Sequence, residues 1–279
     1  MAYKTLFTTV TDPAAAEAPL NVATALCRAW DAHLDVLTMG IDRTQTGYYY
    51  AGANAMVLQE TLQRAQAEAN DLEAQIRAKL EPEDLRWNVE TAVAAIADLG
   101  RHVAARARFS DLAIMAQPYG DSTGVELEPV LEAALFDGDT SVLMVPTGYD
   151  GPTDFKRIVI GWNESAEALN AVRRALPLLK AAEFVSIAII NPPTHGPERS
   201  DPGGRLSEFL SRHGVHVEIS VLAKTMPRIS DVLARHAEDS GADLMVMGGY
   251  GHSRFREAIL GGATRGILEN AKLPVFLSH

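Results

Sequence analysis

Residues 242–251 read ADLMVMGGYG, and Gly261-Gly262-Ala263-Thr264 follows after nine further residues. The apolar run Leu244–Met247 is typical of a buried parallel strand, so the first glycines stand where a strand turns into a loop. Open α/β sheets bind ligands at that edge. Glycine puts no Cβ between backbone and ligand, so N–H groups and a following helix can converge on an anion. The spacing predicts a phosphate-binding loop; a tight turn that lets a helix approach the sheet is the structural alternative.

The same segment continues through Thr264 into a helix-like stretch and then Pro274-Val275-Phe276-Leu277. This order resembles the nucleotide-binding signature of the universal stress protein family, strongly over residues 155–279 and more weakly over 1–150. The resemblance implies an adenine nucleotide alpha hydrolase-like fold. It also implies a regulatory module of the stress response that binds ATP or AMP, with or without Mg²⁺.

Composition narrows the class of protein. The 279 residues are 47% hydrophobic and 22% charged, as in soluble globular proteins, and suit one large or two ordinary domains. A net charge of −11 argues against a broad nucleic-acid or anionic-membrane surface. The single cysteine, Cys27, falls on a helical apolar stripe, which predicts a core residue. No leader-like or membrane-spanning stretch is evident, so a cytoplasmic location is expected.

The chain contains two copies of one unit. Tyr3–Val10 and Phe155–Trp162 each read as an aromatic residue, a lysine and then a strand. Further matching segments are the predicted helices Ala14–Trp30 and Ala166–Lys180, the strands His33–Met39 and Phe184–Ile190, the strands 110–116 and 242–247, and the last strands Ser141–Val145 and Pro274–Leu277. Alternating strands and helices require parallel pairing. Two Rossmann-like, open parallel-sheet α/β domains in tandem are therefore expected.

The two copies differ between their second and third strands. The first has a long helix over Ala55–Leu80, and the second has a Pro- and Gly-rich loop over 191–204 before a short helix and the strand His216–Leu222. Residues 147–154, with two glycines and a proline, read as a linker. The predicted domains are therefore residues 1–147, with a degenerate nucleotide site, and 154–279, with the glycine loop.

The base end of the expected site comes from the first two strands of the second copy. The resemblance places Gly161, Trp162 and Asn163 at the base or ribose, where family members usually have an aspartate instead of Asn163. An amide still donates and accepts hydrogen bonds; capping of the next helix is the alternative for this asparagine. Ile189 and Ile190 match the position whose backbone faces adenine, with ordinary core packing as their alternative.

The phosphate end follows the strand at 244–247. Met247, Gly248, Gly251 and Gly261 match the motif, whereas Gly262 replaces the Ser or Thr of the family's nucleotide binders. That change removes one hydrogen bond of about 1 kcal/mol and leaves the N–H groups of residues 262–264 available. The residues expected at the phosphate end are Met247, Gly248, Gly251, Gly261, Gly262, Ala263 and Thr264; Thr264 as a helix cap is an open alternative.

Charged residues beside the glycine loop, and a search for known catalytic motifs, add little evidence about the function. His252, Arg254 and Arg256 could supply positive charge to a phosphate, although solvated charges are the commoner outcome. Neither a P-loop nor a nucleophile elbow is present, so no catalytic residue and no metal site are assigned. In the first copy the loop after residue 116 carries Asp121, Glu126 and Glu128, which repel phosphate. In the first copy, Asp12 provides the acidic residue expected at the base end of the site. Capping of the following helix is the alternative role for Asp12.

The leading hypothesis is a tandem universal stress protein with one nucleotide site, in the C-terminal domain. The alternatives are a nucleotide-free adaptor that binds other proteins and a slow ATPase. The expected partners are an adenine nucleotide and an unknown protein, but neither nucleic acid nor membrane. By resemblance, the two halves pair as an intramolecular pseudo-dimer, with a further homodimer as an option.

Overall fold

The computed structural model describes residues 2–43, 55–120, 124–192, 201–249 and 262–279. The chain divides into two compact units, one made of Tyr3–Thr140 and the other centred on Ser141–His279. Both units are α/β, with mostly parallel open sheets as the sequence predicted. The predicted domain ranges, 1–147 and 154–279, differ from this division in assigning Ser141–Val145 to the first half.

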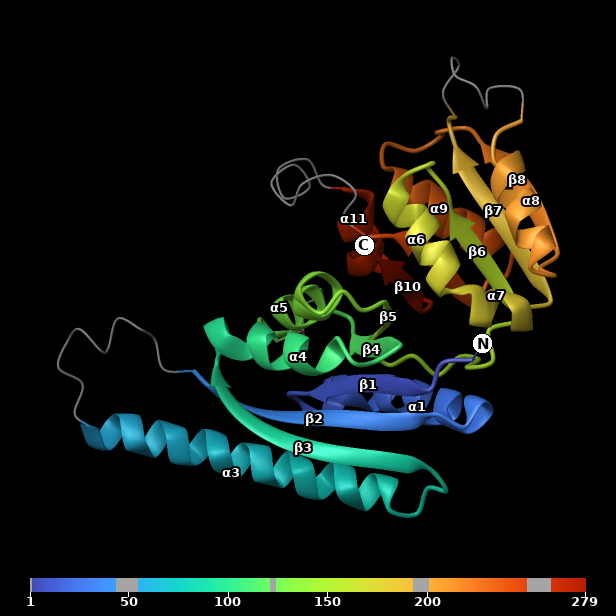
Figure 1. Ribbon diagram of the computed structural model, residues 1–279. Helices are drawn as coiled ribbons and strands as arrows, with labels where there is room; N and C mark the ends of the chain where they lie inside the picture. Colours follow the sequence, from blue (N-terminus) through green and yellow to red (C-terminus); the bar gives the residue numbers. More distant parts are fainter. Residues whose placement is uncertain (1, 44–54, 121–123, 193–200, 250–261) are drawn as a thin grey trace. The chain divides into compact units, whose positions relative to one another are not determined.

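The N-terminal unit contains a four-stranded parallel sheet in the order β3-β2-β1-β4 (Figure 1). Its elements are β1 (Thr5–Val10), α1 (Pro13–Trp30), β2 (His33–Asp42), α3 (Ala55–Leu80), β3 (Arg86–Ala95), a 3₁₀ turn (Ile96–Asp98), α4 (Leu99–Ala107), β4 (Leu112–Ala116), α5 (Leu127–Glu132) and a π turn (Ala133–Asp137). The long helix α3 packs on β2 and β3, where Ala65 and Ala69 are buried.

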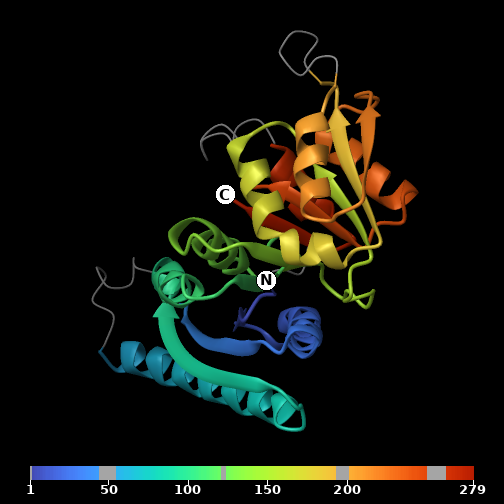
Figure 2. The ribbon, with the colours of Figure 1, turned by 45° about the vertical axis from the view of Figure 1, so that its right-hand side comes forward.

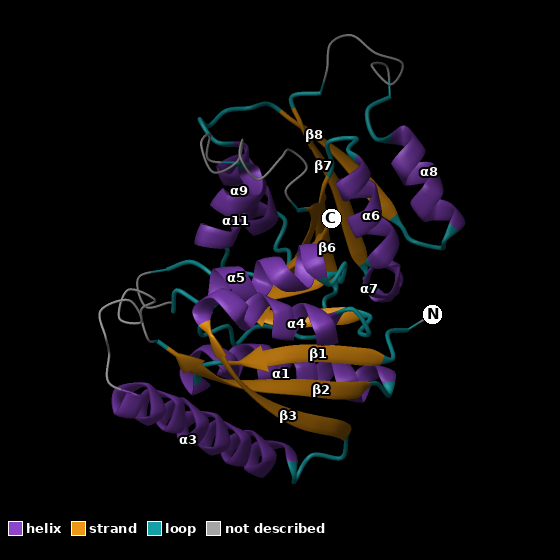
Figure 3. Ribbon diagram, turned by 60° about the vertical axis from the view of Figure 1, so that its left-hand side comes forward, coloured by secondary structure: helices purple, strands orange, loops and turns teal. Residues whose placement is uncertain are grey.

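The C-terminal unit contains a sheet in the order β5-β10-β9-β6-β7-β8. Its elements are β5 (Val142–Val145), β6 (Arg157–Gly161), α6 (Ala166–Arg174), α7 (Leu176–Ala181), β7 (Phe184–Ile190), α8 (Gly204–Arg212), β8 (Val217–Leu222), α9 (Ile229–Asp239), β9 (Leu244–Gly248), α11 (Ala263–Asn270) and β10 (Val275–Ser278). All pairings are parallel except β5 with β10, in which Leu143 lies opposite Phe276. Helices α6 to α8 cover one face of this sheet and α9 and α11 the other (Figures 2 and 3).

One predicted helix proved to be two. The sequence predicted a single helix over Ala166–Lys180, whereas α6 ends at Arg174 and α7 begins at Leu176. Pro177 stands in the first turn of α7. Proline has no N–H and its ring opposes the carbonyl four residues earlier, so it interrupts a helix but is tolerated in a first turn.

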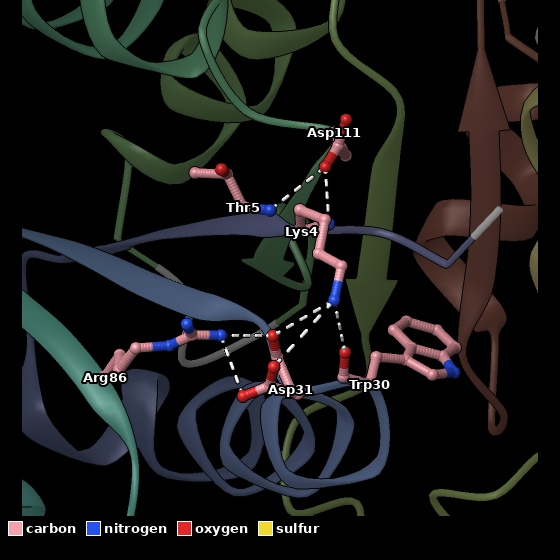
Figure 4. A network of polar contacts seen from close by, with 6 residues as sticks. All are labelled: Lys4, Thr5, Trp30, Asp31, Arg86 and Asp111. Atoms are coloured by element: carbon pink, nitrogen blue, oxygen red, sulfur yellow. Dashed lines mark hydrogen bonds and ion pairs between the residues drawn. The ribbon is translucent and has the colours of Figure 1, made fainter.

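In both units, an aspartate carboxylate accepts hydrogen bonds from the backbone at the start of the first strand. In the N-terminal unit the Asp111 carboxylate accepts hydrogen bonds from the backbone N–H groups of Lys4 at 2.6 Å and Thr5 at 3.0 Å (Figure 4). In the C-terminal unit Asp243 accepts from Lys156 at 2.8 Å and Arg157 at 3.0 Å. These aspartates occupy matching positions in the two sequence repeats, directly before β4 and β9.

Cys27 lies in the core of the N-terminal unit, as the apolar stripe predicted. Its side chain is 1% exposed, and burial, followed by the charge of Asp35, raises the pKa of the thiol to about 12. The nucleophilic thiolate is therefore scarce at neutral pH.

We expect Cys27 to resist alkylation in the native protein and to react readily after denaturation. The measurement is the rate of modification by a thiol reagent at neutral pH, with and without denaturant. Rapid modification of the native chain would contradict the burial of this thiol.

Candidate functional site at the carboxyl ends of β6 and β9

In the C-terminal sheet, the direction in which successive strands are added reverses between β6 and β9. From β6 the chain proceeds outward to β7 and β8, and it then returns to the other side of β6 to form β9 and β10. Ligands of open α/β sheets bind outside the carboxyl ends of the strands at such a switch point. Gly161 at the end of β6 is the register partner of Met247 in β9. The structure thus brings together two segments that lie more than eighty residues apart in the sequence.

Trp162 follows β6 directly at this point. Its backbone N–H donates to the carbonyl of Ala188 at 3.0 Å, which fixes the start of the loop against β7. Its indole Nε1 is buried and has no hydrogen-bond partner among the described residues. Buried donors are almost always paired, so an orphaned N–H calls for a missing acceptor. Thr11, the first residue after β1, likewise has a buried hydroxyl without a partner in the described part of the chain.

Asn163 and Ser165 shape the turn into α6. The Oδ1 atom of Asn163 accepts from the Ser165 N–H at 3.2 Å, and the Ser165 hydroxyl caps the helix by accepting from the Ala168 N–H at 3.1 Å. The helix cap that the sequence offered as an alternative for Asn163 is therefore wrong. A serine two residues later takes that role, because it holds the extended backbone of an N-cap. Asn163 itself is exposed beside the switch point.

Gly248 has a packing role. A Cβ at this position would lie 2.6 Å from the backbone N of Ala168 and 2.8 Å from the carbonyl carbon of Glu167. The absence of a side chain therefore lets the first turn of α6 rest on the end of β9, as the structural alternative for this glycine proposed. The next residue, Gly249, donates its N–H to the carbonyl of Ser278 at 2.9 Å. These contacts hold the backbone at the end of β9, where the glycine-rich segment begins.

The end of β7 contributes backbone to the same edge. Ile189 is 5% exposed, so its side chain belongs to the core, while Ile190 is half-buried. Asn191 adopts a left-handed backbone with φ of 48° and donates its N–H to the carbonyl of Leu222. The core alternative is thus confirmed for the Ile189 side chain.

The N-terminus of α11 closes the described part of the motif. Gly262 is the N-cap residue, with φ of −58° and ψ of 158°, and the helix has no side-chain cap. Thr264 is buried in the first turn, and Gly262 occupies the cap position, so the alternative that Thr264 caps this helix is wrong. An α-helix leaves its first N–H groups without intrahelical partners, so an anion is favoured here. Gly251, His252 and Gly261, as well as Arg254 and Arg256, lie outside the described residues.

The corresponding edge of the N-terminal unit uses its polar groups internally. The Asp12 carboxylate caps α1 by accepting from the Ala15 N–H at 2.9 Å, which confirms the structural alternative. Glu128 accepts a hydrogen bond from the Tyr119 hydroxyl at 2.7 Å, and Glu126 is 5% exposed. Asp121 lies outside the described residues.

The described residues contain no group of three or more His, Cys, Asp or Glu side chains arranged to hold a metal ion. Within the same residues, no helix combines the length and the apolar character needed to cross a membrane.

Comparisons with known proteins agree with this fold. Residues 154–279 match the model of the Universal stress protein family. A universal stress protein of Synechocystis sp. is 26% identical over 108 residues, a match that spans 37% of this chain and 37% of that protein's length. The solved structure of a universal stress protein from Archaeoglobus fulgidus DSM 4304 covers 100% of this chain and 96% of its own, with a TM-score of 0.75 and 14% identity. A protein of unknown function from Pseudomonas aeruginosa PAO1 covers 99% of this chain and 92% of its own, with a TM-score of 0.57 and 14% identity. At these identities the solved structures establish the fold, and the family match establishes that residues 154–279 form a domain of the universal stress protein family.

Proposed function

We propose that the C-terminal unit binds one adenine nucleotide, ATP or AMP, at the switch point between β6 and β9, and that the chain is a regulatory module of the stress response. The observation that carries the proposal is the buried Trp162 Nε1 donor, which has no partner among the described residues. It lies next to the register pair Gly161 and Met247. Adenine and ribose offer the acceptors that this donor lacks.

The phosphate end of the proposed site is the N-terminus of α11. The helix begins after the glycine pattern, has no side-chain cap, and places glycine at the N-cap. The positive end of the helix dipole favours a phosphate at this point. At the base end of the proposed site, Asn163 supplies an amide instead of a carboxylate. This end therefore offers hydrogen bonds to the base or ribose without a negative charge.

We further propose that the two halves form an intramolecular pseudo-dimer. Its support is the antiparallel pairing of β5 with β10, the last strands of the two sequence repeats. The hydroxyls of Ser141 and Ser278 lie 3.5 Å apart beside this pair. An unpaired apolar strand edge invites aggregation, and mutual pairing removes one edge from each repeat.

A nucleotide-free adaptor is the second candidate, and the Gly248 contact favours it. The close packing of α6 on Gly248 already explains why this residue is a glycine. No ligand is needed to explain the glycine. Under that alternative, Trp162 would not respond to any nucleotide.

The test is the indole N–H signal of Trp162 in a ¹⁵N NMR spectrum. The chain has three tryptophans, and Trp162→Phe assigns the relevant signal by its loss. We expect ATP to shift the Trp162 signal, because the donor gains an acceptor, and to leave those of Trp30 and Trp87 in place. If saturating ATP and AMP leave all three signals unmoved, the adaptor candidate takes precedence.

A further inference from the structure

A cavity of about 430 Å³ lies between the β8–α9 loop and α11 in the C-terminal unit. Its wall includes Lys224 and Arg228 of the loop, Ile229 and Ser230 at the start of α9, and Arg265 of α11. A volume of this size is in the range of small-molecule sites, about 300–1,000 Å³. Helices α9 and α11 are neighbours on one face of the sheet (Figure 3).

The floor of the cavity is a close approach of the two helices. A Cβ on Gly266 would lie only 2.6 Å from the Ser230 hydroxyl oxygen, so α11 reaches the first turn of α9 only because residue 266 is glycine. Ser230 is 3% exposed, and among the described residues its hydroxyl makes one long contact, 3.4 Å to Asp231 Oδ1. An ordinary O–H···O bond is about 2.7–2.8 Å long, so this buried donor is poorly satisfied where it borders the cavity.

The charge around the cavity is positive. Arg265 is paired with Glu269, which also lines the wall, at 2.8 Å. Lys224 and Arg228 have neither an ion pair nor a hydrogen bond among the described residues, although the chain as a whole carries a net charge of −11. Three cations thus face one carboxylate in a concave site. The first turn of α9 adds backbone N–H groups, since its N-cap residue, Arg228, makes no side-chain capping bond.

We propose that this cavity binds the phosphate group of a small phosphorylated molecule, with Lys224 and Arg228 as its main charged contacts. Charge-assisted hydrogen bonds are the strong ones, and arginine presents donors that match phosphate geometry. Pro227 and Ile229 supply an apolar wall beside the cations, and the volume leaves room for more than a bare phosphate. The proposal stands on the cavity and its charges and does not rest on adenine recognition at Trp162.

The probe is inorganic pyrophosphate, titrated by calorimetry into the full chain at about 0.15 M ionic strength, where the Debye length is about 8 Å. We expect one saturable site per chain, weakened by about tenfold or more in Lys224→Gln/Arg228→Gln. Both side chains are exposed in a loop or at a helix start, so the fold should tolerate their replacement. The matched control is Arg173→Gln/Lys180→Gln, which removes the same charge from exposed residues of α6 and α7, on the opposite helical layer.

The control should bind pyrophosphate within about twofold of the wild type, because general electrostatics alone contributes little at that distance in buffered salt. Equal weakening in both double variants, or no saturable binding to the wild type, would overturn the proposal. A second titration with ATP-saturated protein identifies the source of the phosphate. Displacement by ATP means that the cavity holds the outer phosphates of the nucleotide, and undiminished binding means a separate phosphorylated compound. Because pyrophosphate has no base, failure of adenine binding would leave this result intact.

Discussion

Replacing Gly262 by aspartate should abolish ATP binding, whereas replacing it by asparagine should not. Gly262 is the N-cap of α11 with φ of −58°, a backbone that any L-residue adopts without strain. Aspartate and asparagine are both good N-caps, so the helix should be kept or slightly stabilised in either variant. Only aspartate places a negative charge at the proposed phosphate position, and we expect its affinity for ATP to fall by about a hundredfold or more.

The same position provides the opposite test. Gly262→Ser restores the hydroxyl that the family's nucleotide binders carry, so we expect ATP to bind a few-fold to about tenfold more tightly. Calorimetric titration of ATP into the three variants and the wild type gives the affinities, and thermal unfolding checks that the fold is unchanged. Equal affinities across the series, with unchanged stability, would mean that phosphate does not approach residue 262.

Replacing Gly40 by alanine should destabilise the N-terminal unit by about 3 kcal/mol. Gly40 lies in β2 beneath α3, and a Cβ there would stand 1.9 Å from the carbonyl oxygen of Ala65 and 3.0 Å from the Cβ of Ala69. The clash is with helix backbone, so α3 as a whole must move away from the sheet. Amide hydrogen exchange in α3 should therefore accelerate together with the loss of stability.

Gly161→Ala is the matched control for this substitution. A Cβ at Gly161 would meet its nearest neighbour, a Leu233 methyl, at 3.4 Å, which is an ordinary contact. We expect its stability to change by less than about 1 kcal/mol. Denaturant unfolding of the two variants measures the difference. A Gly40→Ala protein as stable as the control, with normal exchange in α3, would contradict the packing of α3 on β2.

Local sequence signals predicted most of the elements. Hydrophobic patterns placed the strand Phe184–Ile190 and the helix Ala55–Leu80 at the bounds that the structure shows. The break between α6 and α7 was missed although its signal, Pro177, stood in the sequence; the Ala-rich pattern on both sides outweighed it in the prediction. The division of the chain before β5 could not be foreseen in this way, because it follows from the pairing of β5 with β10. Strand pairing over more than a hundred residues leaves no local trace.

The sequence indicated which segments lie at the candidate site but not which contacts their side chains make. Matching motifs placed Trp162 and Met247 in one site, and the register of β6 with β9 brings them to the same sheet edge. The indole N–H, which has no partner among the described residues, is a property of the packed structure, and so is the use of Ser165 instead of Asn163 as helix cap. Lys224 and Arg228 were not singled out at all. Two exposed cations after a strand are ordinary in a sequence, and only the approach of α11 to α9 makes them the wall of a cavity.

We have proposed that each chain has one adenine-nucleotide site, located in its C-terminal unit. Calorimetric titration of ATP into purified protein, freed of any bound ligand, measures the number of sites. We expect saturable binding with a stoichiometry of about one nucleotide per chain, because only the second repeat carries the glycine pattern and the first uses Asp12 as a helix cap. Two equivalent sites per chain, or no binding of ATP or AMP at saturating concentration, would refute this proposal.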